Sequence, residues 1–159
     1  ILATLITDSV DSLCAKLRGM ARFREEDPFI RGIVRGFHVE GPFLNAAPGY
    51  IGAHPPQHVV PANPGDAARI LEAGQGLVRL MTLAPEHDVD AATPRFPAGQ
   101  GVTVSAGHCD PDLATLEPMP ITAGVGYTHG YIPWLQPEPH DMPLDAMITE
   151  DGVVWDRTA

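Results

Sequence analysis

The sequence has few of the features typical of disulfide-rich proteins, of nucleic-acid-binding proteins and of membrane proteins. It contains only two cysteines, Cys14 and Cys109, far apart and outside any CxxC pair, so we expect no disulfide framework and a reducing, cytoplasmic location. Basic residues are scarce, since 10 lysines and arginines stand against 20 acidic residues. An acidic surface repels nucleic acid and anionic lipid, so we expect neither as a partner. No apolar run approaches the ~20 residues of a membrane-spanning helix, which argues against a membrane protein.

The apolar residues that are present predict alternating strands and helices. The chain has 159 residues, of which 44% are hydrophobic, enough for one compact domain with a sizeable core. Strands are predicted at residues 1–7, 33–40, 78–85 and 101–107 and again at 123–128, and helices from Val10 to Ala21, from Pro64 to Ala73, from Val89 and at 110–116. Because the strands are nearly continuous in apolar residues, they indicate a parallel sheet buried on both faces in an α/β protein.

Polar residues stand where these strands end. Glu40, Glu86, His108 and His129 each lie at the carboxyl end of a predicted strand, the last three at intervals of 22 and 21 residues. In a (β/α)₈ barrel of the TIM type the carboxyl ends of all strands meet at one mouth, where active sites are built. This placement favours a barrel over an open sheet, and no GxGxxG or Walker motif supports the open sheet. We therefore predict a partial barrel with parallel strands, truncated at both ends because a full barrel takes ~250 residues.

Two imidazoles and one carboxylate at such a mouth are typical of a metal centre. Glu40, His108 and His129 are the candidate ligands for a divalent cation, with Zn²⁺ or Fe²⁺ favoured. Three protein ligands leave a position open for water, whose pKa the metal lowers towards ~7. The predicted chemistry is hydrolysis of an amide or an ester.

Five short motifs carry a family resemblance. They are GFHVEGPFLN at 36–45, GAH at 52–54, TLAPE at 82–86, SAGH at 105–108 and TH at 128–129. In this order they resemble an internal segment of N-acetylglucosamine-6-phosphate deacetylase, of the amidohydrolase superfamily. The resemblance implies a metal-dependent hydrolase barrel, commonly dimeric, that removes the acetyl group from a small amino-sugar phosphate. It also implies Glu40, His108 and His129 as metal ligands, the same three residues that the strand ends indicate.

Other residues near these motifs have more than one interpretation. The resemblance implies that His54 polarises the acetamide carbonyl of the substrate, with Ala53 beside it, although a surface histidine in a Pro-rich loop is the alternative. His38 lies on the same side of its strand as Glu40, so it either orients that carboxylate or is a plain buried, hydrogen-bonded histidine. For Glu86 we expect a structural hydrogen bond at the barrel mouth. Cys109 is expected to be a small buried residue rather than a fourth ligand.

The resemblance weakens after His129. The chain continues GYIPWLQPEPHDM, where the family has an Asn-containing substrate-binding stretch. We therefore predict a barrel segment at 1–129 and a divergent, Pro-rich acidic segment at 130–159. The general acid/base aspartate of the family is expected beyond the matched segment, and we assign the role to no residue here, including Asp141, Asp145, Asp151 and Asp156. Two alternatives stay open: another amidohydrolase with a different amide substrate, and a non-catalytic, truncated metal-binding fragment.

Overall fold

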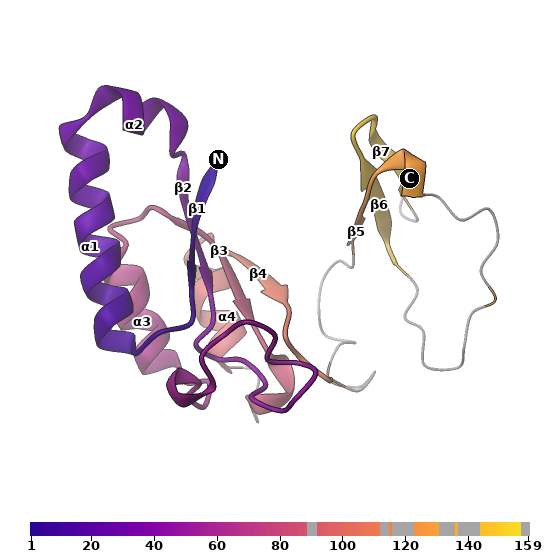
Figure 1. Cartoon of the computed structure of the whole chain (residues 1–159), viewed down its shortest axis with the longest axis horizontal. Helices are drawn as coiled ribbons and strands as arrows, with labels where there is room; N and C mark the ends of the chain where they lie inside the picture. The colour runs from indigo at the N-terminus through magenta and orange to yellow at the C-terminus, as the bar shows by residue number, and fades with distance from the viewer. Residues whose placement is uncertain (89–91, 112–114, 116–122, 131–135, 137–143, 157–159) are drawn as a thin grey trace. The chain divides into compact units, whose positions relative to one another are not determined.

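The computed structural model describes residues 1–88, 92–111, 115, 123–130, 136 and 144–156. The chain divides into two compact units, Ile1–Asp112 and Leu113–Ala159, whose positions relative to one another are not determined (Figure 1). Each unit is therefore described by itself, and the domain boundary predicted between residues 129 and 130 stays a prediction. Within the described residues, no helix is long and apolar enough to cross a membrane.

The first unit is built around a four-stranded sheet in which each strand lies next to its successor in the chain. The strands are β1 (Leu2–Ile6), β2 (Gly36–Glu40), β3 (Val78–Leu83) and β4 (Thr103–Ala106), and the order in the sheet is β1-β2-β3-β4. All three neighbouring pairs are parallel. The helices are α1 (Val10–Glu26), α2 (Pro28–Ile33), α3 (Pro64–Ala73) and α4 (Ala92–Gly99). The predicted α/β class with a parallel sheet is confirmed.

The core lies between this sheet and the helices α1, α3 and α4, which pack along one of its faces (Figure 1). Phe37 and Val39 of β2 are fully buried in it, as are Leu17 of α1 and Ile70 of α3. Because side chains alternate along a strand, His38 and Glu40 point to the face opposite that of Phe37 and Val39. The side chains on that face are polar and half-buried. The sheet was predicted to be buried on both faces, and only the face that the helices cover is fully buried.

Two capping residues, Ser9 and Asp27, explain where α1 and α2 begin. The Ser9 hydroxyl caps α1 by accepting a hydrogen bond from the Ser12 N–H at 3.2 Å. Asp27 ends α1 and caps α2, because its carboxylate accepts from the Phe29 N–H at 2.8 Å. The prediction of a strand from Ile33 was wrong, since Ile33 is the last residue of α2 and β2 begins at Gly36. Pro28 is the first residue of α2, where its missing N–H costs nothing.

Three further elements predicted for the first unit are present in the structure. The helix from Pro64 to Ala73 is confirmed as α3, and the strands predicted at 78–85 and 101–107 are confirmed in shorter form as β3 and β4. The helix predicted from Val89 begins at residues outside those described, and α4 occupies Ala92–Gly99. Most of the turn predicted at 110–116 also lies outside the described residues. Two short 3₁₀ helices, η1 (Pro56–His58) and η2 (Pro85–His87), follow β2 and β3.

The second unit contains β5 (Ala123–Val125), the 3₁₀ helix η3 (Thr128–Gly130), β6 (Ala146–Thr149) and β7 (Gly152–Asp156). β5 pairs with β6 in parallel and β6 with β7 in antiparallel fashion. The Glu150 carboxylate accepts hydrogen bonds from both the N–H and the hydroxyl of Thr128, which hold the pKa of Glu150 below its usual range. The ring of His129, one residue on, stacks on Tyr127 at 5.5 Å between centroids.

A truncation in the core tests this architecture. Leu17 is 0% exposed between α1 and the sheet, so Leu17→Ala is expected to lower the free energy of unfolding by about 2–5 kcal/mol. The control is Leu2→Ala, because Leu2 is 37% exposed and is expected to lose less than about 1 kcal/mol. Urea unfolding followed by circular dichroism measures both, and equal losses in the two variants would contradict the assigned core.

Candidate metal centre

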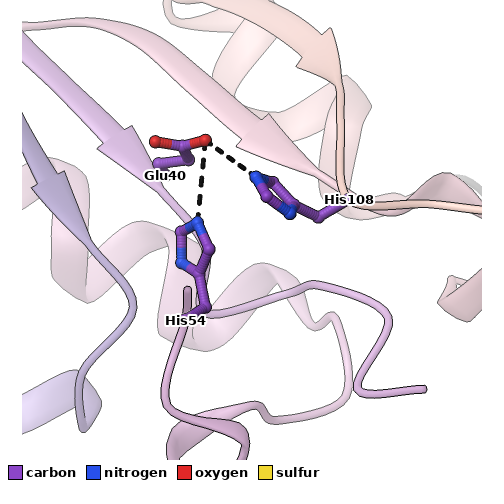
Figure 2. A group of neighbouring side chains, drawn as sticks. All are labelled: Glu40, His54 and His108. Carbon is purple, nitrogen blue, oxygen red and sulfur yellow. Dashed lines mark hydrogen bonds and ion pairs between the residues drawn. The ribbon is translucent and has the colours of Figure 1, made fainter. Parts of the chain in front are cut away.

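Glu40, His54 and His108 converge beyond the carboxyl end of the sheet (Figure 2). Glu40 is the last residue of β2, His54 lies in the loop that follows it, and His108 lies just after β4. Each offers one ligand atom, and the three atoms lie within 4.8 Å of one another. The structure thus brings together two of the three predicted ligands, Glu40 and His108, and places the predicted substrate residue His54 beside them.

The turn after Glu40 is set by Gly41. Its φ of 87° lies in the left-handed region, and a Cβ built there would stand 2.0 Å from the Thr7 hydroxyl oxygen, so a side chain does not fit. The Gly41 N–H donates to the Thr82 carbonyl at 3.0 Å, and the Thr7 hydroxyl donates to the Glu40 carbonyl at 3.3 Å. These contacts tie the end of β2 to its two neighbouring strands and thereby hold the Glu40 carboxylate in place.

The partners of His108 define which of its ring nitrogens carries the hydrogen. Nδ1 lies 2.8 Å from the Tyr50 carbonyl oxygen, which can only accept, so Nδ1 must donate. In the neutral ring Nε2 then holds a lone pair, and it lies 3.1 Å from Oε1 of Glu40, which is also an acceptor. Two electron pairs therefore face each other across 3.1 Å, an arrangement that a cation or a proton between them would stabilise.

His54 has the opposite tautomer. Its Nδ1 accepts the Thr7 N–H at 3.3 Å, so the hydrogen of the neutral ring is on Nε2. That N–H is directed towards Oε1 of Glu40 at 3.7 Å (Figure 2). The side chain is 6% exposed, and burial lowers its pKa, as does the neighbouring His108 ring, while Glu40 acts in the opposite direction. His54 is consequently a neutral hydrogen-bond donor at neutral pH.

This donor set fits a divalent metal ion. A carboxylate oxygen and an imidazole lone pair at adjoining positions are ligands that Zn²⁺ and Fe²⁺ accept. Glu40 and His108 supply them directly, and His54 becomes a third ligand only if its hydrogen moves from Nε2. His129 lies in the second unit, so its part in the site stays a prediction.

The other candidate residues have defined surroundings. His38 makes hydrogen bonds to the hydroxyls of Thr4, at 3.2 Å, and Thr82, at 2.9 Å, and burial lowers its pKa. It is a hydrogen-bonded histidine in the sheet, and a role in orienting Glu40 stays a prediction. Cys109 is half-buried and burial raises the pKa of its thiol to about 11, so the thiol is protonated at neutral pH and is a poor metal ligand.

Sequence reasoning missed Thr7 and Tyr50, whose backbone groups set the two histidine tautomers. Thr7 is the last residue of the strand predicted at 1–7, so its place at a strand end was available as a signal. Nothing in the sequence around Tyr50 indicates that its carbonyl faces His108, because that contact joins residues 58 positions apart.

Comparison with known proteins gives the following findings. No protein-family model matches the chain. N-acetylglucosamine-6-phosphate deacetylase of Danio rerio is 31% identical over 157 residues, which are 98% of this chain and 38% of the relative. The crystal structure of N-acetyl-D-glucosamine-6-phosphate deacetylase from Mycobacterium smegmatis aligns with a TM-score of 0.66 and 31% identity over 79% of this chain and 32% of that one.

The chain resembles a segment of N-acetylglucosamine-6-phosphate deacetylase. It spans about a third of the length of these relatives, which are enzymes. A mutant of the Mycobacterium smegmatis deacetylase, solved in complex with N-acetyl-D-glucosamine-6-phosphate, aligns with the same TM-score of 0.66 and 31% identity, over 78% of this chain and 32% of that one. The resemblance to the deacetylase inferred from the five motifs is thereby confirmed.

The protonation of His54 gives a prediction for the metal-free protein. Its pKa is expected below the ordinary value of 6.5 in the folded state and near it in the unfolded state. Because the unfolded state then binds more protons, the stabilising contribution of His54 is complete above pH 6.5 and is lost as the pH falls below it. A proton NMR titration of the histidine rings, assigned with His54→Gln, measures the pKa. A His54 pKa above 6.5 in the folded protein would contradict the arrangement described.

Proposed function

We propose that the protein is a metal-dependent hydrolase that removes the acetyl group from N-acetylglucosamine 6-phosphate. The observation that carries the proposal is the pairing of the Glu40 carboxylate with the lone pair of His108 at 3.1 Å, beside the donor His54. The resemblance to the deacetylases supports the reaction, and the solved complex of one relative supports the substrate. A small amino-sugar phosphate is thus the proposed partner.

In this proposal Glu40, His108 and His129 hold one Zn²⁺ or Fe²⁺ ion. The ion supplies Lewis acidity, which polarises an amide carbonyl and makes bound water a better nucleophile at neutral pH. The Nε2–H of His54 donates to the acetyl carbonyl oxygen as that atom gains negative charge, which is the role of an oxyanion donor. Ala53, the preceding residue, lines the same substrate position.

The reaction balances as a simple hydrolysis. The oxygen of water bonds to the acetyl carbon, the carbon–nitrogen bond breaks, both protons of the water pass to the sugar nitrogen, which leaves as an ammonium group, and the acetyl group leaves as acetate. The neutral state of His54 suits a group that donates a hydrogen bond without giving up its proton. We assign the general acid/base of the reaction to none of the described residues.

The finer features of the fold are part of the same proposal. We infer that residues 1–129 form part of a (β/α)₈ barrel and that residues 130–159 form a divergent segment. The sequential order of parallel strands in the first unit supports this, because successive strands of such a barrel are neighbours. We further propose a homodimer and a cytoplasmic location, as the resemblance and the two isolated cysteines lead us to expect.

Metal analysis combined with acetate release tests the proposal. The full chain is expected to bind about one equivalent of Zn²⁺ or Fe²⁺ and to release acetate from N-acetylglucosamine 6-phosphate. Metal binding without acetate release would support a non-catalytic metal-binding protein, and turnover of another amide alone would support a different amidohydrolase. Absence of metal binding would contradict the centre itself.

Replacement of the shared carboxylate gives a sharper test. Glu40→Gln is expected to abolish acetate release and to weaken metal binding by more than the ~10–100-fold typical for loss of an outer partner of a ligand. The matched control is Glu72→Gln, because Glu72 is an exposed residue of α3 away from the site. Full activity and full metal affinity in Glu40→Gln would contradict the assigned site.

Replacement of His108 and replacement of His54 are expected to have different effects on metal binding and on turnover. His108→Ala should lose the metal, because it removes the ring lone pair that faces Glu40. His54→Ala should keep most of the metal and lower kcat about 10²–10³-fold, the usual effect of removing one oxyanion donor. Metal content by atomic emission and steady-state kinetics separate the two, and equal loss of metal in both variants would show that His54 is a ligand instead.

A further inference from the structure

Glu86 joins the ends of three neighbouring strands through one oxygen atom. It lies in η2 after β3, and its Oε1 accepts two hydrogen bonds. One comes from the Asn45 side-chain amide at 3.0 Å, in the loop after β2, and the other from the Asp110 N–H at 2.7 Å, in the loop after β4. The Glu86 side chain is 16% exposed, so these bonds form away from most of the solvent.

His108 lies between the two groups that Glu86 holds. The Asn45 N–H donates to the His108 carbonyl at 2.9 Å, and Asp110 follows His108 by two residues. His108 has a φ of 51°, a left-handed conformation that residues with a Cβ seldom adopt. Such a conformation persists only where the surroundings hold it. The two bonds to Glu86 hold Asn45, which contacts the His108 carbonyl, and Asp110, which fixes the chain just after His108.

The ring of His108 belongs to the same closed network. Its Nδ1–H donates to the Tyr50 carbonyl, and the Tyr50 hydroxyl is hydrogen-bonded to the Asp110 carboxylate, which raises the pKa of Tyr50. Glu86, Asn45, His108, Tyr50 and Asp110 thus form a ring of contacts that begins and ends at Glu86. Both the backbone and the tautomer of His108 depend on that ring.

We propose that Glu86 is a positioning residue of the metal centre, which acts by holding His108 so that Nε2 presents its lone pair to the Glu40 carboxylate. The inference rests on the proposed metal centre and goes beyond it, since Glu86 itself is not among the proposed ligands. Both donors bind the same oxygen, Oε1, while Oε2 is buried without a hydrogen-bond partner among the described residues. One correctly placed acceptor oxygen is therefore what the network needs from this residue.

Cobalt binding to the metal-free full chain tests the proposal. Glu86→Ala is expected to bind Co²⁺ ~10–100-fold more weakly than the unaltered protein and to change the visible spectrum of the bound ion. Glu86→Gln keeps an acceptor oxygen and is expected to restore both to within about threefold. Glu72→Ala removes an exposed carboxylate of α3 and serves as the control for loss of charge.

Two further measurements keep the outcomes distinct. In the unaltered metal-free protein the His108 Nδ1–H is expected to give a slowly exchanging ring N–H signal in ¹H–¹⁵N NMR, which Glu86→Ala should lose. If Glu86→Ala does not fold, Asn45→Ala removes one of the two donors, and its Co²⁺ affinity takes the place of the first measurement. Unchanged Co²⁺ affinity, spectrum and ring signal in a folded variant would overturn the role of Glu86 and leave the metal centre standing. Failure of the unaltered protein to bind Co²⁺ would overturn the metal centre and this inference with it.

Discussion

The site depends on one contact, in which Oε1 of Glu40 and Nε2 of His108 lie 3.1 Å apart with no hydrogen of the neutral ring between them. Both atoms are acceptors, because the Tyr50 carbonyl holds the imidazole hydrogen on Nδ1. Such a pair is unfavourable by itself and becomes favourable around a cation. The surrounding loops hold it in place nonetheless, and this is the reason for proposing a cation there.

The parallel sheet explains how residues 68 positions apart come to form this pair. Each strand of a parallel sheet ends at the same edge, so the loops after β2, β3 and β4 meet there. The core between the sheet and the helices makes the sheet rigid, and residues at and just after the strand ends form the site. Glu40 is positioned by a packed strand, whereas His54 and His108 lie in loops that hydrogen bonds to Thr7 and Tyr50 hold in place.

The sequence predicted the members of the site better than their arrangement. Glu40 and His108 could be found because polar residues at strand ends are conspicuous against apolar strands, and the core of α1 and α3 followed from helical spacing. No helix was predicted between the one that ends at Ala21 and the strand at 33–40, so α2, which Asp27 caps and Pro28 begins, was missed. The tautomers of His54 and His108 could not be predicted, because backbone groups 47 and 58 positions away determine them.

These backbone groups fix opposite tautomers in two histidines that face the same carboxylate. A backbone N–H at Thr7 takes the lone pair of Nδ1 in His54 and leaves an N–H directed into the site. A backbone carbonyl at Tyr50 takes the Nδ1 hydrogen of His108 and leaves a lone pair there. A carbonyl substrate needs a donor for its oxygen, and a cation needs an electron pair. In the proposed hydrolase, one strand-end carboxylate flanked by one histidine of each kind would meet both needs, and the difference between the two histidines follows from two main-chain contacts.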